Sequence, residues 1–238
     1  MKLQEMTWED FQSAETLVGL IPTGSTEQHG PHGPFATDLI IAEEMAANAA
    51  EETGALVLPS ISVGISREHQ DFEGSLYISP DTFRQQLREM ILSASSSGIE
   101  RFVVVNGHGG NISAIYEVCK SLYIEYTTIA LEWTWFNAIS ARNMGHAGEL
   151  ETSLLMFLRP DLVKEPREPG AGTWGHKFHG TRVDYLTSSF TKNGIVGDPT
   201  KATKEKGEEL FNRSTKKLKQ LIRDLYSPDQ DFLSEKTR

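Results

Sequence analysis

The sequence has one cysteine, no block of lysine and arginine, and no long hydrophobic run. Cys119 cannot form a disulfide within the chain, and its apolar neighbours predict a small buried side chain rather than a nucleophile. A net charge of −10 without a basic stripe disfavours binding to duplex nucleic acid. No apolar stretch approaches the length of a membrane span, and the first residues lack the apolar core of a signal peptide. We therefore expect a cytoplasmic protein with no nucleic-acid and no membrane partner.

The 238 residues, 38% of them hydrophobic, suffice for a buried core in which short apolar runs alternate with helical patterns. We expect strands at about 17–22, 55–59, 102–105 and 127–133. We expect helices after Thr7, from Thr37 as the cap, after Ser79, over about 112–124, after Gly148 and from about Thr200. The alternation predicts one domain over residues 1–238, an α/β layered sandwich with a mainly parallel central sheet flanked by helices.

Two further segments stand apart from this alternation. The glycine- and proline-rich stretch 165–197 is long for a loop in a compact domain, so we expect it to be functional or an arm at an interface. Residues 227–238 are charged, and we expect them to form a flexible tail.

Residues with metal-binding chemistry follow two of the expected strands. Segment 27–32 follows the first strand and segment 106–111 follows the third. Ligands of α/β sheets gather beyond the carboxyl ends of the strands, so we expect the two segments to meet. Glu27 and His29 share one face of an extended chain, and Asp38 stands at a helix start, where the dipole favours a carboxylate. Carboxylates with imidazoles suit Zn, Mn or Fe(II) rather than Ca.

Simpler interpretations compete with this metal site. Asp38 is equally explained as an N-terminal helix charge, and Glu27 and His29 as solvated loop residues. Segment 106–111 around His108 resembles a nucleotide-phosphate loop in its glycines, but it does not match Gly-x-Gly-x-x-Gly. A Ser-His-Asp hydrolase is disfavoured because the sequence has no Gly-x-Ser-x-Gly elbow.

A third segment, 145–153, opens another expected helix with two acids. His146 and Glu149 would share a helix face, whereas Glu149 and Glu151 would point about 200° apart. Glu151 falls within the apolar arc of this helix, and a buried carboxylate needs partners. Glu151 is therefore either a support for metal ligands or itself a ligand, unless the segment is simply an acidic first turn.

Together the three segments resemble the creatininase family of metal-dependent amidohydrolases. Gly-Ser-Thr-Glu-Gln-His-Gly-Pro-His at 24–32 with Thr-Asp at 37–38, Asn-Gly-His-Gly-Gly-Asn at 106–111 and His-Ala-Gly-Glu-x-Glu-Thr-Ser at 146–153 occur in the family's order. The resemblance implies a creatininase-like sandwich, a homo-oligomer that is usually a hexamer, and two divalent metal ions per subunit (Fe²⁺, Zn²⁺ or Mn²⁺). Carried over by position, it implies the metal ligands Glu27, His29, Asp38 as the bridge, and His108.

The sequence departs from the family at Gly110, where creatininases carry a metal-binding glutamate. We expect Glu149 to complete the metal shell in its place and to take part in catalysis. His146 is our candidate to protonate the leaving nitrogen, with helix capping or metal ligation as the alternative. Residues expected to support the ligands or to contact substrate are Glu151, Asn106, Arg67, His69, Trp174 and His176.

The resemblance implies hydrolysis of a non-peptide C–N bond, an amide or formamide, by a hydroxide held between the metals. Stretch 66–83 most resembles the branch that deformylates 2-amino-5-formylamino-6-ribosylaminopyrimidin-4(3H)-one 5'-monophosphate in riboflavin and deazaflavin synthesis. The alternatives are a creatininase-like hydrolase of a small cyclic amide and a non-catalytic metal- or nucleotide-binding module; the family also has a peptide-trimming branch. The deformylase substrate needs an anion site, for which the available basic residues are Arg67, Arg84, Lys177, His179 and Arg182.

The aromatic and remaining histidine residues near these segments allow two interpretations each. Trp133, Trp135 and Trp174 could wall a planar substrate, but packing in the core or at an interface is the favoured interpretation. His176 and His179 have a spacing that could bind metal, but the favoured interpretation is a glycine-rich loop that folds over the site or contacts a neighbouring subunit.

Overall fold

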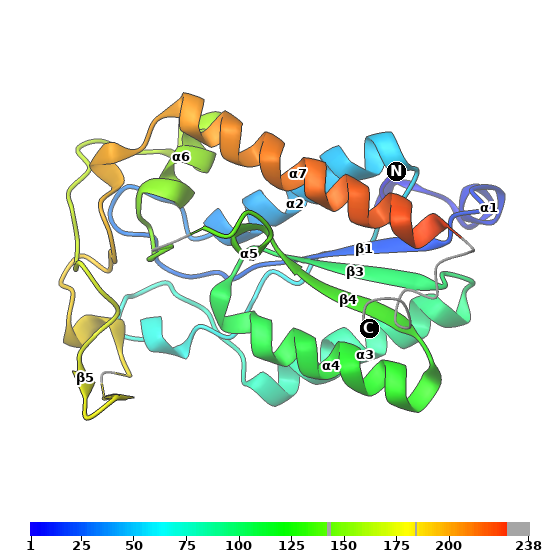
Figure 1. The fold of residues 1–238 in the computed structure, drawn as a ribbon, viewed down its shortest axis with the longest axis horizontal. Helices are drawn as coiled ribbons and strands as arrows, with labels where there is room; N and C mark the ends of the chain where they lie inside the picture. Colours follow the sequence, from blue (N-terminus) through cyan, green and yellow to red (C-terminus); the bar gives the residue numbers. More distant parts are fainter. Residues whose placement is uncertain (142–143, 184, 228–238) are drawn as a thin grey trace, which may run out of the picture.

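In the computed structural model, which describes residues 1–141, 144–183 and 185–227, four parallel strands form the central sheet. Their order is β2-β1-β3-β4, with β1 at Val18–Thr23, β2 at Leu56–Val57, β3 at Arg101–Asn106 and β4 at Ile129–Thr134. Helices cover both faces of the sheet (Figure 1). The predicted α/β layered sandwich is confirmed, and the tail expected at 227–238 lies, from residue 228 on, outside the described residues.

The two central strands are buried along nearly their whole length, which explains their continuous apolar sequences. β1 and β3 run parallel in register from Val18 beside Arg101 to Thr23 beside Asn106. Both strands therefore end at the same edge of the sheet. The segments that follow Thr23 and Asn106 start side by side. The Thr23 hydroxyl donates a hydrogen bond to the side-chain oxygen of Asn106, although the two residues are 83 positions apart in the sequence.

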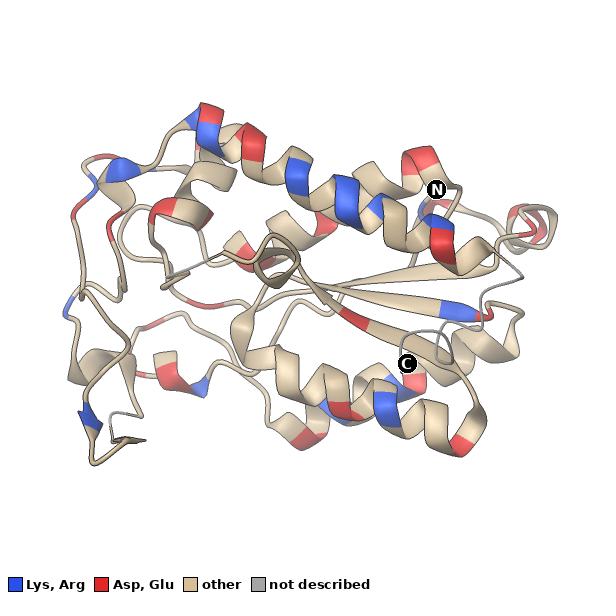
Figure 2. Cartoon of the chain, viewed as in Figure 1, with Lys and Arg blue, Asp and Glu red and all other residues tan. Residues whose placement is uncertain are grey.

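One face of the sheet is covered by α2 (Thr37–Thr53), α6 (Glu149–Leu158) and α7 (Lys204–Tyr226). The other face is covered by α3 (Pro80–Ser96) and α4 (Ile112–Tyr126) (Figure 1). Each face has its own apolar core, centred on residues such as Met45 and Leu218 on the first and Phe83 and Ile115 on the second. Acidic and basic residues are interspersed along the outer helices rather than gathered in a stripe (Figure 2).

The helix starts follow local capping chemistry at two of the predicted positions. Thr7 caps α1 (Trp8–Ser13) in a reciprocal capping box with Asp10. Ser79 accepts a hydrogen bond from the Thr82 amide at the start of α3. α7 begins at Lys204, four residues later than expected, because a 3₁₀ turn at Pro199–Lys201 precedes it.

The prediction that Thr37 caps α2 is wrong. Thr37 is the first residue of the helix, and its hydroxyl donates to the Pro34 carbonyl at 2.7 Å instead of accepting from the helix. Ala36 occupies the cap position without a side-chain bond. Asp38 nevertheless lies in the first turn, where its carboxylate is buried.

Residues 165–183 and 185–197 form an arm at the edge of the sheet where β1 and β3 end (Figure 1). The arm contains a small antiparallel hairpin, β5 (Lys177–Phe178) with β6 (Thr181–Arg182). Val196 at its end exchanges backbone hydrogen bonds with His146 at 2.8 and 2.9 Å. The arm is thereby fixed to the start of α6. Among the described residues, no helix is both long and apolar enough to cross a membrane.

Candidate metal centre

The carboxylate of Asp38 lies between two imidazoles that come from the two strand-end segments. Asp38 Oδ1 is 3.3 Å from His29 Nε2, and Oδ2 is 3.1 Å from His108 Nδ1. Glu27 Oε1 is 3.3 Å from the same His108 nitrogen. All four side chains are buried. The structure thus brings together the loop after β1, the start of α2 and the loop after β3.

Backbone carbonyls fix which nitrogen of each imidazole faces the cluster. His29 Nδ1 is 3.1 Å from the Glu27 carbonyl oxygen, and His108 Nε2 is 2.9 Å from the Ile65 carbonyl oxygen. A carbonyl only accepts, so these nitrogens carry hydrogen. In the neutral imidazoles, the opposite nitrogens, His29 Nε2 and His108 Nδ1, therefore present lone pairs toward the carboxylates. Metal-binding histidines are commonly oriented in this way.

Several buried polar atoms at the centre have no hydrogen-bond partner among the described residues. They include both carboxylate oxygens of Glu27, Oδ2 of Asp38 and Nε2 of His29. Buried carboxylates without partners are costly, and lone pairs that face one another need a cation or a proton between them. Separations of 3.1 to 3.3 Å between these atoms match ligands that each lie about 2.0–2.2 Å from a metal. The residues therefore fit divalent cations.

Two asparagines shape the loop that carries His108. Asn106 Oδ1 accepts from the His108 amide at 3.1 Å, and Asn106 Nδ2 donates to the His108 carbonyl at 2.7 Å. Asn111 Nδ2 donates to the Gly24 carbonyl at 2.9 Å, which joins this loop to the one after β1. Asn106 thus holds the backbone of His108 in place.

The start of α6 completes the centre with Glu151 and His146. Glu151 Oε2 accepts from the Ala147 amide and lies 4.0 Å from His29 Nε2. His146 Nδ1 is 3.5 Å from Glu27 Oε1. Ala147 has a φ of 51°, and this reversal turns both side chains inward. Three groups have ligand atoms within 4.8 Å of one another: Glu27 with His29 and Asp38, His29 with His146 and Glu151, and Glu27 with His69 and His146.

The structure does not place Glu149 where we expected it. Its carboxylate pairs with Lys206 of α7, and its side chain is 31% exposed. It belongs to none of the three groups of possible ligands. Two residues along a helix correspond to about 200°, and the buried side of α6 is that of Glu151. The carboxylate that α6 brings to the cluster is therefore that of Glu151.

Gly110 leaves no room for the glutamate that creatininases have at this position. A Cβ at Gly110 would lie 2.2 Å from the Ile65 carbonyl oxygen and 2.5 Å from His108 Nε2. Real Cβ contacts are never this close. The backbone of residue 65 fills the space because it holds His108, so the missing carboxylate must come from elsewhere.

Burial and mutual attraction shift the pKa values of the cluster in opposite directions. Burial alone would raise the pKa of Glu27, but His108 and its neighbours hold it well below the usual range. Burial alone would lower the pKa of His29, yet Asp38 raises it to about 9. Burial raises the pKa of Glu151 to about 7 and lowers that of His146 well below its usual value. His146 is therefore neutral near pH 7.

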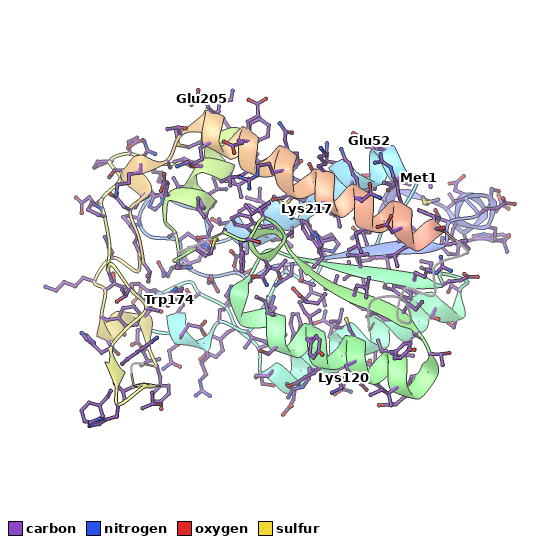
Figure 3. All side chains as sticks on the ribbon, in the orientation of Figure 1. Met1, Glu52, Lys120, Trp174, Glu205 and Lys217 are labelled. Carbon is purple, nitrogen blue, oxygen red and sulfur yellow. The ribbon has the colours of Figure 1, made fainter. Side chains whose placement is uncertain are left out.

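A cavity of about 340 Å³ opens onto the cluster. Trp174 lies on the arm (Figure 3). It lines this cavity, and its ring centroid is 6.0 Å from that of His146. Trp133 and Trp135 pack in the core instead. Four lining residues that the sequence interpretation did not single out are Glu68, Phe136, Met144 and Gly145.

Other candidates from the sequence lie away from the cavity. Arg67 and His176 are exposed, on the 3₁₀ turn Arg67–His69 and on the arm respectively. His69 is fully buried beside Glu27 and does not line the cavity. Nothing in the sequence distinguishes these residues from the ones that line the cavity, because only the path of the loops decides which side chains reach it.

A parallel α/β sandwich that gathers buried carboxylates and imidazoles at the carboxyl edge of its sheet offers ligands for metal ions at that edge. The creatininase family profile, described as creatinine amidohydrolase, matches residues 4–222, and the chain belongs to this family. It is accordingly an enzyme of the amidohydrolase class.

Relatives within the family carry different activities. The mycofactocin precursor peptide peptidase of Mycobacterium ulcerans is 35% identical and covers 81% of this chain and 79% of its own. The 2-amino-5-formylamino-6-ribosylaminopyrimidin-4(3H)-one 5'-monophosphate deformylase of Methanococcus voltae is 31% identical over 52% of this chain and 49% of its own. A creatininase structure with Mn superposes with a TM-score of 0.84 at 23% identity, over 95% of this chain and 99% of that one. This last likeness shows the fold.

Proposed function

We propose that the protein hydrolyses an amide bond by means of two divalent metal ions held at the Asp38 cluster. The observation that supports this proposal is the pair of Asp38 oxygens, each facing a different imidazole among otherwise unpartnered buried carboxylates. One ion would be held by Glu27, His108 and Asp38 Oδ2. The other would be held by His29, Asp38 Oδ1 and Glu151, which takes the place we had expected for Glu149.

Such ions bring the pKa of a water close to neutrality and polarise a carbonyl. Residues of the chain would orient the substrate and transfer protons during this hydrolysis. His146 lines the cavity, its Nε2 is 2.7 Å from the Gln28 carbonyl oxygen, and its Nδ1 faces Glu27. Nδ1 is therefore the atom that takes up a proton and delivers it to the leaving nitrogen.

The walls of the cavity favour a substrate without a phosphate group. Arg84 pairs with Asp81 and Glu117 on the outer surface of α3 and α4, and Lys177 is exposed on the hairpin. No lysine or arginine of the described segments lines the cavity, whereas Phe136, Met144 and Trp174 do. We therefore favour an amide of a short peptide over the formamide of a nucleotide, which revises our expectation of a non-peptide C–N bond. The 81% coverage by the peptide peptidase, against 52% by the deformylase, supports the same preference.

Purified protein tests the proposal in two steps. Metal analysis should give two divalent ions per chain, and removal of the ions by a chelator should abolish hydrolysis that Zn²⁺, Mn²⁺ or Fe²⁺ restores. Short peptides, creatinine and the formamidopyrimidine nucleotide are then compared for amine or formate release. Peptide cleavage is the expected result. Formate release would show that the protein is a deformylase. Metal binding without hydrolysis of any of these amides would contradict the proposed hydrolysis.

We also propose that the chain forms a homo-oligomer. The arm exposes Phe178, Val183 and Tyr185, of which Tyr185 is 79% exposed. Aromatic side chains in such positions are typical of subunit contacts. Light scattering should give a mass that is a multiple of 26.5 kDa, six-fold for the hexamer of the resemblance. A monomer at micromolar concentration would contradict this proposal.

A further inference from the structure

Gln28 lies between His69 and His146 with an amide whose orientation the backbone fixes. Its Oε1 accepts from the Gly30 amide at 2.8 Å, and its Nε2 donates to the Gly194 carbonyl at 2.9 Å. A 180° rotation of this amide would place two acceptors against each other at Gly194 and two donors at Gly30. Gln28 is 6% exposed, and a Cβ at Gly194, whose φ is +77°, would lie 2.0 Å from Gln28 Oε1.

The second hydrogen of the Gln28 amide decides the tautomer of His69. Gln28 Nε2 is 2.9 Å from His69 Nδ1 and 3.0 Å from His146 Nε2. Nε2 of His146 already carries a hydrogen, because it is 2.7 Å from the backbone carbonyl oxygen of Gln28, which can only accept. The amide hydrogen therefore goes to His69 Nδ1, which accepts it. A neutral His69 then carries its own hydrogen on Nε2.

This tautomer changes what His69 can do beside Glu27. His69 Nε2 is 3.6 Å from Glu27 Oε1, and its atoms are close enough to those of Glu27 and His146 to form a ligand group. A nitrogen that carries hydrogen cannot bind a metal, but it can donate to a carboxylate. His69 does not line the cavity, so any effect on substrate must pass through its neighbours Glu27 and His146, whose ring centroid is 4.4 Å from that of His69.

We infer that Gln28 is a positioning residue: it makes the His69 ring nitrogen that faces Glu27 at 3.6 Å an N–H group, and therefore a donor rather than a third imidazole ligand. The backbone carbonyl of Gln28 also accepts from Nε2 of His146, so that Nδ1 of His146 faces the cluster. The inference rests on the metal centre of the proposed function but does not depend on which amide is hydrolysed.

The tautomer itself is measurable in the zinc-loaded protein labelled with ¹⁵N in histidine. Protonated and unprotonated ring nitrogens have well-separated ¹⁵N chemical shifts, and the His69→Gln variant identifies the His69 signals. We expect His69 with Nδ1 unprotonated and Nε2 protonated. In Gln28→Glu, whose carboxylate can only accept, the hydrogen of His69 should move to Nδ1. A metal-bound Nε2 in the unmodified protein would overturn the inference.

Metal content separates a donor from a ligand without any assay of hydrolysis. His69→Gln keeps an N–H group near the position of Nε2 but has no imidazole lone pair, so it should retain two equivalents of zinc. His29→Gln, the matched control at a proposed ligand, should lose one equivalent. Gln28→Glu should weaken zinc affinity by about 10- to 100-fold, the usual effect of disturbing the partners of metal ligands. Loss of one equivalent in His69→Gln would make His69 a ligand and overturn the inference.

The outcomes also separate this inference from the proposed function. A protein with the expected His69 tautomer and two zinc ions that hydrolyses no amide would contradict the proposed function alone. Circular dichroism of each variant excludes loss of folding as the cause. Should Gln28→Glu fail to fold, the ¹⁵N spectrum of the unmodified protein and the zinc content of His69→Gln decide the matter.

Discussion

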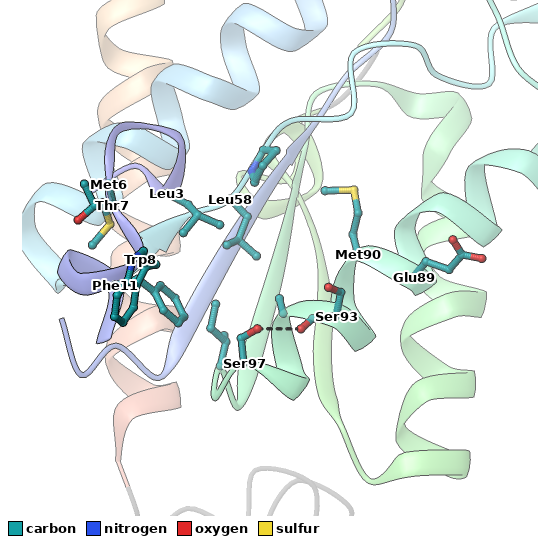
Figure 4. A pocket seen from close by; sticks show the side chains of 13 residues that line it. Leu3, Met6, Thr7, Trp8, Phe11, Leu58, Glu89, Met90, Ser93 and Ser97 are labelled. Carbon is teal, nitrogen blue, oxygen red and sulfur yellow. Dashed lines mark hydrogen bonds between the residues drawn. The ribbon is translucent and has the colours of Figure 1, made fainter. Parts of the chain in front are cut away.

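The two ends of the central sheet carry cavities of opposite character. At the amino end, a cavity of about 570 Å³ lies between the N-terminal segment and the end of α3, lined by apolar residues such as Leu3, Phe11 and Met90 (Figure 4). At the carboxyl end, a smaller cavity of about 340 Å³ opens onto buried carboxylates and imidazoles. Among the residues that the structure describes, the lining of the larger cavity has no buried side-chain polar atom without a hydrogen-bond partner. The smaller one contains charges that need a partner, so unsatisfied chemistry rather than volume marks the site.

Because the carboxyl end holds buried charged groups in close-packed loops, it also contains glycines and asparagines with specific structural roles. Loops there approach one another closely enough that Gly110 admits no Cβ, and Asn106 and Asn111 satisfy the backbone. The amino end is held by ordinary contacts, and Trp8 on its rim is 70% exposed. Substitutions at the two ends should therefore differ in kind, because one end positions charges and the other only covers apolar surface.

The largest effect should follow loss of Asp38, the carboxylate between both imidazoles. Asp38→Ala removes the bridge, so both metal ions should be lost and amide hydrolysis should fall by roughly 10³-fold or more, which corresponds to several kcal/mol of transition-state stabilisation. Metal analysis and steady-state kinetics measure this. Asp161→Ala, an exposed carboxylate paired with Arg159, is the control and should change neither. Full metal content in Asp38→Ala would refute the arrangement.

A second comparison is made within α6, between Glu151 and Glu149. Glu151→Gln should lose about one equivalent of metal and most activity because its buried carboxylate faces His29. Glu149→Gln should keep both ions, since it breaks only a partly exposed pair with Lys206, worth no more than about 1 kcal/mol. Metal content and thermal unfolding distinguish the two variants. The reverse pattern would restore Glu149 as the ligand that the sequence suggested.

An intermediate effect is expected at Gly110. Gly110→Ala forces a Cβ against the Ile65 carbonyl and His108, so stability should fall by about 1–3 kcal/mol and metal affinity with it. Gly109→Ala is the matched control, because its Cβ would meet only Phe136 at 3.8 Å. Denaturant unfolding and zinc titration measure the two effects. If Gly110→Glu instead supplied a working ligand in the Glu151→Gln background, the steric account would fail.

The smallest effect is expected at the amino end. Trp8→Ala should leave metal content unchanged and activity within about twofold, and should lower the free energy of unfolding by less than about 1 kcal/mol, because Trp8 is mostly exposed. Kinetics and chemical denaturation test this. A loss of activity comparable to that of Asp38→Ala would mean that the larger cavity, not the smaller one, serves the substrate.

Much of the fold could be predicted from the sequence because its signals are local. The apolar runs of β1 and β3, the capping box at Thr7 and the Ser79-Pro80 helix start each depend on neighbouring residues. The cap of α2 was mispredicted for the same reason. Thr37 has the right chemistry, but the Pro34 carbonyl competes for its hydroxyl, and that competition depends on the path of the preceding loop.

The site divides along the same line. The motifs in the sequence predicted that Glu27, His29, Asp38 and His108 lie together. Parallel strands end at one edge of the sheet, so the segments after β1 and β3 must meet there. Tertiary structure decided the rest. The rotation of α6 about its axis turns Glu151 rather than Glu149 toward the cluster, and the Ile65 carbonyl leaves no room for a side chain at Gly110. The arm places Trp174 and Val196 beside His146. These choices depend on contacts between residues distant in sequence, and sequence periodicity carries no information about such contacts.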